Sequence, residues 1–352
     1  MALYLDRLEM KRYSGIEAIE KKEYYELSPM QKRFYIFQAL ESGEISYNIS
    51  ETMVLEGAVS KEKFEETFER MIRRHESLRT SFQVVKGEPV QRIHDGVDFG
   101  IEYERSMEKC PGNGEVSSPS LSGFIRPFDL SRAPLARIGL IKVEVGKHFF
   151  IFDMHHIIAD GVSMGIMIKE FLDVYAGKEL PPLRVQYKEY VQWKKQRRKK
   201  ETAPGPRLEE TALNLPLDFP RPAVPDFKGK TIEFAIDDLD RVSGLLSLQE
   251  GITLYMVLLA AFNIFLAKIS GQENIVVGSP IAGRQHTDLE GIIGLFINTL
   301  VLQNIPAGHK RSSDFLIEVK NHVLEAFENQ DYQYDELIEK TTSHRGASHN
   351  PL

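Results

Sequence analysis

The chain has 352 residues and a formal net charge of -7, and 42% of its residues are hydrophobic while 27% are charged. These values are typical of a globular protein, and the length suits one large domain or two lobes. Because a nucleic-acid-binding surface normally needs a basic domain, the acidic balance argues against nucleic acid as a partner. The single cysteine, Cys110, cannot form an internal disulfide, which fits a reducing cytoplasm.

The apolar segments argue against a membrane partner. The N-terminus lacks the apolar stretch of a signal peptide. The longest apolar segment, residues 254–269, contains Asn263 and Lys268 and is short for a bilayer span, so a buried helix is the better interpretation. The basic run at residues 194–200 indicates a solvated helix end or a linker. We therefore expect a cytoplasmic protein.

The first half of the chain predicts both helices and strands. Residues 1–24 are charged and weakly patterned, which indicates a lead-in rather than core. Ser28 is a plausible N-cap for a helix that begins at Pro29. The spacing of apolar residues predicts strands at 50–55, 136–143 and 148–153 and helices at 61–75 and 165–175. The last of these strands is apolar without alternation, as in a central strand covered on both faces.

Residues 195–230 differ from both flanks because six prolines lie within them, which excludes a regular helix or a central strand. Beyond them, the pattern predicts helices at 253–270 and 315–328 and strands at 274–278 and 300–304. Helices alternate with strands in both halves, which favours the α/β class. The expected organisation is a lead-in at 1–24, an N-terminal lobe at 25–194, an inter-lobe connection at 195–230 and a partial C-terminal lobe at 231–352.

Two adjacent histidines, His155 and His156, stand where the predicted central strand ends, and Asp160 and Gly161 follow them. An imidazole can take up a proton and return it near neutral pH. Adjacent residues of an extended segment point to opposite sides, so one ring can face a cleft while the other packs inward. Asp160 is better placed to anchor the loop through a basic partner, and Gly161 to permit a tight turn or a close approach of the backbone to a ligand. The plainer alternative is a pair of structural histidines.

The pattern His155-His156-x-x-x-Asp160-Gly161 resembles the active-site signature of the condensation domains of non-ribosomal peptide synthetases. Further blocks that resemble this family follow in its order at residues 27–35, 74–82, 187–193, 293–299, 329–335 and 345–352.

The resemblance implies an α/β protein with a two-lobed, V-shaped, chloramphenicol-acetyltransferase-like fold of mixed sheets and flanking helices. It implies an amide-forming acyltransferase that joins an aminoacyl or peptidyl thioester to an aminoacyl acceptor. Both substrates would arrive on the phosphopantetheine arms of upstream and downstream peptidyl carrier proteins, so no metal or directly bound cofactor is implied. The adenylation domain of the same synthetase would be a further partner.

The resemblance also implies roles for single residues. His156 is the candidate for chemistry, either as general base or by positioning the attacking amine. His155, Asp160 and Gly161 are candidate supports, and Arg284 is the candidate partner of Asp160. Arg79, Asn298 and Ser348 are possible tunnel or structural residues.

Several alternatives stay open. A catalytically inactive fragment or a carrier-docking module would keep the fold without turnover, and an epimerisation domain or a CoA-dependent acyltransferase would share part of the pattern. Heterocyclisation is disfavoured because aspartates would replace the two histidines. The sequence most resembles those of domains that join an L-configured donor to an L-configured acceptor.

The chain departs from the family pattern in several places. Residues 107–122 and 197–212 differ from the family text, and the final block has Gly346 and His349 where Asp and Arg are favoured. Residues 1–24 resemble the linker after an upstream carrier domain, and the chain stops directly after the last block. We therefore expect an incomplete second lobe. The amino acids joined and the final peptide are not specified by the sequence.

Overall fold

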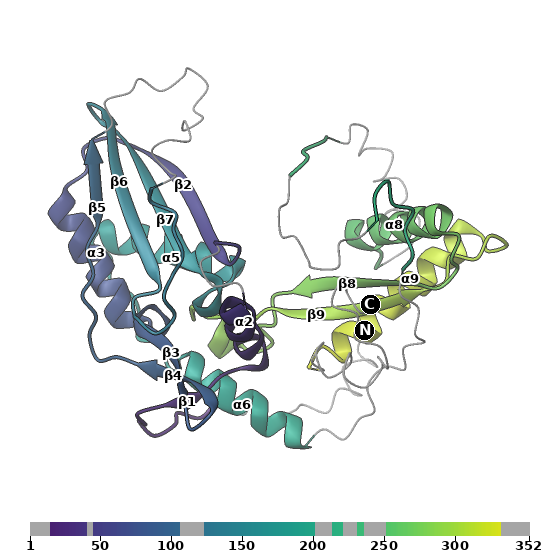
Figure 1. Cartoon of the computed structure of the whole chain (residues 1–352), viewed down its shortest axis with the longest axis horizontal. Helices are drawn as coiled ribbons and strands as arrows, with labels where there is room; N and C mark the ends of the chain where they lie inside the picture. The colour runs from purple at the N-terminus through teal and green to yellow at the C-terminus, as the bar shows by residue number, and fades with distance from the viewer. Residues whose placement is uncertain are drawn as a thin grey trace, which may run out of the picture. The chain divides into compact units, whose positions relative to one another are not determined.

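The computed structural model describes residues 15–40, 45–105, 123–200, 213–220, 231–235 and 251–331. These residues form two compact units (Figure 1). The first contains the described residues up to 200 together with Arg284–Phe296, and the second contains the other described residues from 213 onward. The stretch predicted as one lobe, 231–352, is thus divided between the units, because the chain returns to the first unit at residues 284–296.

The larger sheet of the first unit has four strands, in the spatial order β2 (Asn48–Glu56), β7 (Lys147–His155), β6 (Ala136–Glu144) and β5 (Glu102–Arg105). β7 is antiparallel to both of its neighbours, and β5 runs parallel to β6, so the sheet is mixed. Every residue of β7 after Lys147 is buried. The prediction of a central strand covered on both faces is therefore confirmed.

Two helices, α3 (Lys61–Arg74) and α5 (Gly161–Tyr175), pack beside each other against one face of this sheet (Figure 1). Their contact is aromatic: Phe68 of α3 stacks on Phe171 of α5 with ring centroids 4.6 Å apart, and Phe64 meets Phe150 of β7 at 5.2 Å. Offset or edge-to-face pairs of this kind add to the free energy gained by burial. The opposite face of β7 carries Phe149 and Ile151, which pack in a second apolar cluster.

The remaining elements of the first unit form a small sheet and its surroundings: β1 (Tyr25–Glu26), β4 (Glu88–Ile93) and β3 (Thr80–Val85), with α2 (Pro29–Leu40), η1 (Glu76–Arg79) and α6 (Tyr187–Lys200). The predicted N-cap of α2 is confirmed. Ser28 Oγ accepts the Gln31 N–H at 3.1 Å, and Gln31 Oε1 accepts the Ser28 N–H at 3.0 Å. This reciprocal pair is a capping box, which fixes where the helix begins.

The second unit pairs β8 (Ile275–Ile281) with β9 (Asn298–Asn304) and packs α8 (Leu254–Ser270) and α9 (Ser312–Glu328) around a core that includes Leu302 and Val319. Thr253 caps α8, and Gly271 ends it with φ at 70°, a left-handed conformation that glycine adopts without strain, so both predicted helix ends are confirmed. The buried helix predicted here is buried on one face only. Its other face exposes large apolar side chains: Leu254, Tyr255, Leu258, Phe262, Phe265 and Ile269.

One mixed sheet, two smaller antiparallel sheets and the flanking helices confirm the predicted α/β class. Within the ranges that the structure describes, no helix combines the length and the apolar character needed to span a bilayer.

Candidate active site

The histidine motif occupies the turn between β7 and α5. β7 ends at His155, a short 3-10 helix η2 (His156–Ile158) follows, and Asp160 caps α5. Two backbone bonds hold the turn against its neighbours: the His155 N–H donates to Leu135 O at 3.0 Å, and the His156 N–H donates to Tyr47 O at 2.8 Å. Because the backbone leaves the extended conformation at this point, the two imidazoles enter different surroundings.

His155 is sealed inside the first unit, with 1% of its surface exposed. Its Nδ1 accepts the Ile157 N–H at 3.0 Å, so its proton lies on Nε2, which faces Gln38 Oε1 at 3.3 Å. Burial and, to a smaller extent, the neighbouring His156 lower the pKa of His155 from 6.5 to about 3. His155 is therefore a neutral structural side chain, and the prediction that one ring packs inward is confirmed.

His156 is only partly buried and has the opposite arrangement of its ring nitrogens. Its Nδ1 lies 2.8 Å from Ala159 O, and a carbonyl oxygen can only accept, so Nδ1 carries the proton. In the neutral ring Nε2 then carries the lone pair, and no described residue donates a hydrogen bond to it. The ring rests at a tilt against Phe34 of α2, with centroids 5.1 Å apart. The turn thus fixes both the tautomer and the plane of the ring.

Asp160 is fully buried, and its carboxylate is saturated with donors. Oδ1 accepts the Ser163 N–H at 2.8 Å and the Ser163 hydroxyl at 2.7 Å, and Arg284 Nη2 lies 3.2 Å away. Oδ2 accepts the Phe296 N–H at 3.0 Å. The predicted Asp160–Arg284 ion pair is confirmed. These contacts hold the turn to α5 and to residues 284–296, so Asp160 anchors the turn.

Residues 284–296, here called the return segment, complete the surroundings of Asp160. Arg284 Nη1 donates to Leu289 O and to Ile292 O, each at 2.6 Å, and its guanidinium lies 4.0 Å from the centroid of the Phe296 ring. Burial lowers the pKa of Arg284, and the Asp160 carboxylate opposes that shift. Arg284 therefore binds two carbonyl groups of the return segment and also contacts Asp160 of the histidine motif.

The tight turn expected at Gly161 does not depend on glycine. Gly161 is the first residue of α5, its φ is not positive, and a Cβ placed on it would meet no atom within 4 Å. The conformation of the turn is set instead by the capping side chain of Asp160. The other expectation, a close approach of the Gly161 backbone to a ligand, stays a prediction.

The other predicted residues are not all brought to this turn. Arg79 ends η1, donates to His94 O and lies 3.7 Å from Glu76, so its contacts are with η1 and the residue after β4. Asn298 begins β9 in the second unit and donates to Gln330 O at 2.9 Å. Ser348 lies outside the described residues, as do residues 107–122 and most of 197–212.

Sequence reasoning missed a second buried carboxylate, Asp153, which lies two residues before His155. It accepts hydrogen bonds from Asn48 at 3.0 Å and Ser50 at 2.8 Å, and Arg137 Nη1 lies 2.9 Å away. Burial raises the pKa of Asp153, and these donors oppose the rise. The network ties the end of β7 to both neighbouring strands. A lone carboxylate inside an apolar strand was the signal that could have found it, since a buried charge needs partners.

Tyr187 of α6 was also missed. Its hydroxyl is 2.6 Å from Leu295 O, to which it donates, and 2.9 Å from Ser28 Oγ at the start of α2. Complete burial raises the pKa of Tyr187 well above its usual value, so the phenol stays protonated as a donor. It therefore fastens the return segment to the cap of α2.

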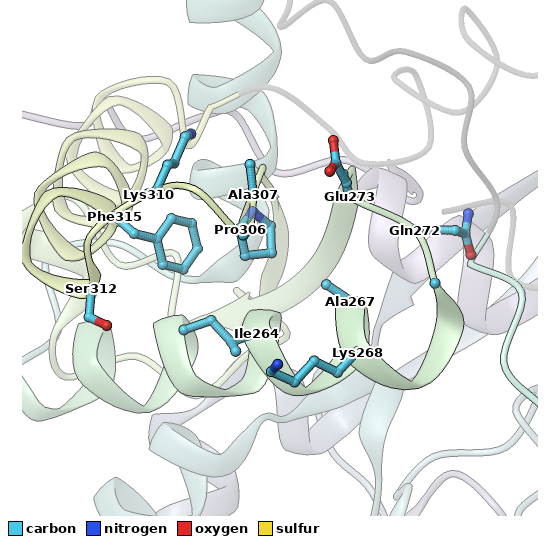
Figure 2. A pocket seen from close by; sticks show the side chains of 12 residues that line it. Ile264, Ala267, Lys268, Gln272, Glu273, Pro306, Ala307, Lys310, Ser312 and Phe315 are labelled. Carbon is cyan, nitrogen blue, oxygen red and sulfur yellow. The ribbon is translucent and has the colours of Figure 1, made fainter.

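The second unit has a pocket of about 350 Å³ between the C-terminal half of α8 and the β9–α9 connection (Figure 2). Ile264 and Phe315 supply apolar wall, and Lys268 lies on its rim. Lys310 of the rim is 2.6 Å from Glu318 and so is already paired. No histidine or cysteine lines this pocket, and the described residues contain no cluster of His, Cys, Asp and Glu suited to a metal ion.

The model of the condensation-domain family matches residues 21–352, which include the whole motif and the return segment. This chain belongs to the condensation-domain family. It is 42% identical over 365 residues to gramicidin S synthase 2 of Brevibacillus brevis, a match that covers 100% of this chain and 8% of the relative. It is 45% identical over 349 residues to tyrocidine synthase 3 of Brevibacillus parabrevis, covering 97% and 5% respectively. The domain thus spans less than a tenth of these relatives.

Solved structures agree with this assignment. The X-domain in its complex with OxyB from teicoplanin biosynthesis has a TM-score of 0.82 at 21% identity, covering 96% of this chain and 78% of the other. The first condensation domain of the calcium-dependent antibiotic synthetase has a TM-score of 0.70 at 15% identity, covering 93% and 79%. At such identities the likeness concerns the fold, and it confirms the predicted condensation-domain fold.

Proposed function

We propose that this condensation domain forms the peptide bond in non-ribosomal peptide synthesis in the cytoplasm. The donor is an aminoacyl or peptidyl thioester, and the acceptor is an aminoacyl group with a free amine. Each is carried by the phosphopantetheine arm of a peptidyl carrier protein in a synthetase that also contains an adenylation domain. The observation that carries the proposal is the Nδ1–H bond from His156 to Ala159 O, which turns Nε2 into a nitrogen to which no residue of the described ranges donates.

The proposed reaction is an acyl transfer from sulfur to nitrogen. The acceptor amine attacks the thioester carbonyl, so that a C–N bond forms and the C–S bond breaks. The attacking nitrogen loses a proton, and the departing sulfur gains one and leaves as the carrier thiol. Nε2 of His156 can accept a hydrogen bond from the amine and take that proton as a general base. If it only positions the amine, the same lone pair is needed, so both roles require the tautomer that the turn imposes.

In this proposal the other motif residues hold His156 in place. Asp160 and Arg284 fix the turn and the start of α5, and His155 supports it from inside as a neutral ring. Arg79 contacts η1 and His94 rather than this turn, and Gly161 stays a predicted support. Asn298 and Ser348 stay predictions as tunnel residues.

The test uses one donor and one acceptor carrier protein, each loaded with its amino acid, and measures dipeptidyl-carrier by intact mass. We expect wild type to form product and His156→Ala to be slower by about 10²–10⁴-fold, the usual contribution of a general base. The matched control is His309→Ala, which removes an exposed histidine of the second unit and is expected to act like wild type. Full product formation by His156→Ala would contradict the role of that residue.

The assay also separates the other interpretations. A well-folded wild-type domain that binds both carriers without product would favour a carrier-docking module. Product formed from a CoA thioester in place of the donor carrier would favour a CoA-dependent acyltransferase. Inversion of the acceptor amino acid without a new amide bond would favour an epimerisation domain.

A further inference from the structure

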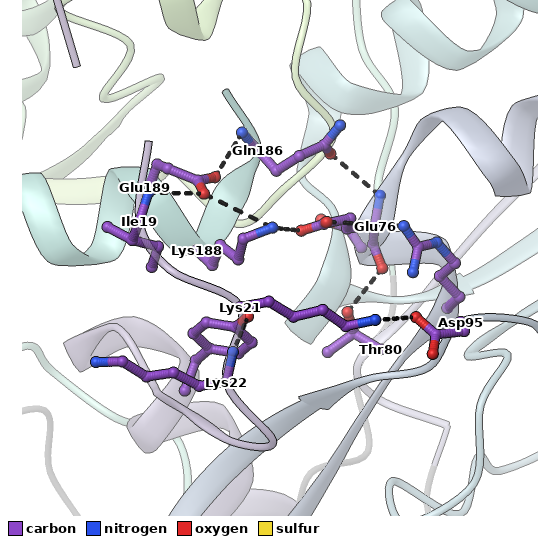
Figure 3. Close-up of polar contacts among 12 residues, drawn as sticks. Ile19, Lys21, Lys22, Glu76, Thr80, Asp95, Gln186, Lys188 and Glu189 are labelled. Atoms are coloured by element: carbon purple, nitrogen blue, oxygen red, sulfur yellow. Dashed lines mark hydrogen bonds and ion pairs between the residues drawn. The ribbon is translucent and has the colours of Figure 1, made fainter. Parts of the chain in front are cut away.

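The described end of the lead-in, which the sequence predicted to lie outside the core, is bonded to the first unit. Residues 15–26, here called the strap, lie along the first unit and end in β1, which pairs with β4. Ile16 is 2% exposed, and a Cβ on Gly15 would meet the guanidinium of Arg184. Farther along, the Ile19 N–H donates to Glu189 at 3.5 Å, and Lys21 Nζ lies 2.5 Å from Asp95 (Figure 3).

The first described anchor of the strap is Asp288, which belongs to the return segment. Asp288 lies in a 3-10 helix, η3 (Thr287–Leu289), and its side chain is 9% exposed. Its Oδ2 accepts the Ile16 N–H at 3.1 Å, and its Oδ1 accepts Arg184 Nε at 3.1 Å. Arg184 also donates to Ile16 O at 3.3 Å. The strap backbone, Arg184 and the Asp288 carboxylate therefore each contact the other two.

The next residue, Leu289, links this anchor to the histidine motif. Leu289 O accepts Arg284 Nη1 at 2.6 Å, and Arg284 Nη2 lies 3.2 Å from Asp160 Oδ1. Leu289 is fully buried, so its carbonyl has no water to replace Arg284 if η3 shifts. An unbroken series of contacts thus runs from the Ile16 N–H through Asp288, Leu289 and Arg284 to the carboxylate that caps α5.

We propose that Asp288 is a positioning residue for the histidine motif and that the strap acts through it. By holding η3, the strap keeps the Leu289 carbonyl aimed at Arg284, and Arg284 in turn stays on Asp160. Fixing Asp160 fixes the turn whose Ala159 carbonyl orients His156. Detachment of the strap and a change in the turn are then energetically coupled. A partner that pulls the strap away from the first unit would therefore alter the turn as well.

A matched pair of variants separates this coupling from simple local fastening. Asp288→Ala removes the anchor that belongs to the return segment. Asp95→Ala removes the exposed anchor of Lys21, which lies outside the series of contacts that leads to Arg284. Amide hydrogen exchange at single residues reads both ends of the series. In Asp288→Ala we expect exchange about tenfold faster at Ile16 and also at Gly294 and Phe296, whose N–H groups bond Ser163 and Asp160. In Asp95→Ala we expect the amides of the return segment to be unchanged.

The ¹⁵N signals of the His156 ring give a second readout, which mere loss of stability would not move in a folded protein. We expect them to shift in Asp288→Ala and not in Asp95→Ala. Faster exchange at Ile16 alone, with Gly294, Phe296 and the His156 ring unchanged, would overturn the proposal. If Asp288→Ala does not fold, Asp288→Asn serves instead, because it keeps one oxygen for the Ile16 N–H and loses the charge and the second acceptor, which Arg184 uses. These readouts observe the folded domain directly, so they do not depend on the proposed reaction.

Discussion

The end of β7 and the turn that follows it place two chemically identical side chains in opposite surroundings. At the strand end, His155 accepts a backbone N–H through Nδ1, is sealed from water and has its pKa lowered to about 3. In the turn, His156 donates through Nδ1 to Ala159 O and keeps Nε2 available. A single change of backbone conformation between neighbours thus separates a scaffold from a candidate base. Burial and one hydrogen bond decide the difference, since the residue type is the same.

Each region also has its own buried carboxylate with an arginine partner. Asp153 pairs with Arg137 at the strand end, and Asp160 pairs with Arg284 at the turn. The strand end is additionally held by the ladders to β2 and β6. The turn has no such ladder, so its conformation depends more on Asp160 than the strand end depends on Asp153.

The largest expected effect in the following comparisons is that of Asp160→Ala. The substitution leaves Arg284 buried without its carboxylate and removes the cap of α5, so we expect the free energy of unfolding to fall by about 3–5 kcal/mol. Urea denaturation measures it. Asp129→Ala, which removes an exposed carboxylate paired with Arg132, is the control and should cost less than about 1 kcal/mol. A loss of similar size in both variants would mean that the turn does not depend on Asp160.

His155 should make stability depend on pH. Its pKa is 6.5 when exposed and about 3 in the folded domain, so the unfolded chain binds the extra proton in the range between them. The stabilisation is therefore complete above about pH 6.5 and is lost as the pH falls toward 3. Between about pH 8 and about pH 5 we expect wild type to lose about 2 kcal/mol more than His155→Gln. Parallel urea titrations of the two proteins test this, and equal losses would mean that His155 is not sealed.

Gly161→Ala should have the smallest effect. Because the φ of Gly161 is not positive and its Cβ position is open, alanine should leave stability unchanged or raise it by up to about 1 kcal/mol. Thermal unfolding and the carrier assay measure the two consequences. A marked loss of stability or of product formation would show that the turn needs glycine. The Asp160 cap would then not be the only feature that sets the start of α5.

Local features of the fold could be predicted from the sequence because their causes are local. The caps at Ser28, Thr253 and Gly271 each depend on one side chain or one φ angle within a few residues of the helix they end. The central strand could be predicted because a continuous apolar run needs cover on both faces. The start of α5 was placed four residues late, since Asp160 was interpreted as an ion-pair partner and its second role as N-cap was missed.

Long-range features could not be predicted from spacing. Asp160 and Arg284 are 124 residues apart, and their pairing came from family resemblance rather than from any local pattern. Ile16 and Asp288 are 272 residues apart, so nothing near either one indicates the fastened strap. The same holds for the two histidine tautomers. Each depends on a backbone partner that becomes a donor or an acceptor only once the turn has formed.

The central claim is that neighbouring histidines hold opposite tautomers, and ¹⁵N-resolved NMR of the imidazole rings at neutral pH tests it most directly. His155→Gln and His156→Gln assign the two sets of signals. The account predicts that His156 carries its proton on Nδ1 and that His155 carries its proton on Nε2. A His156 ring protonated on Nε2 would leave no lone pair for the acceptor amine and would contradict the account.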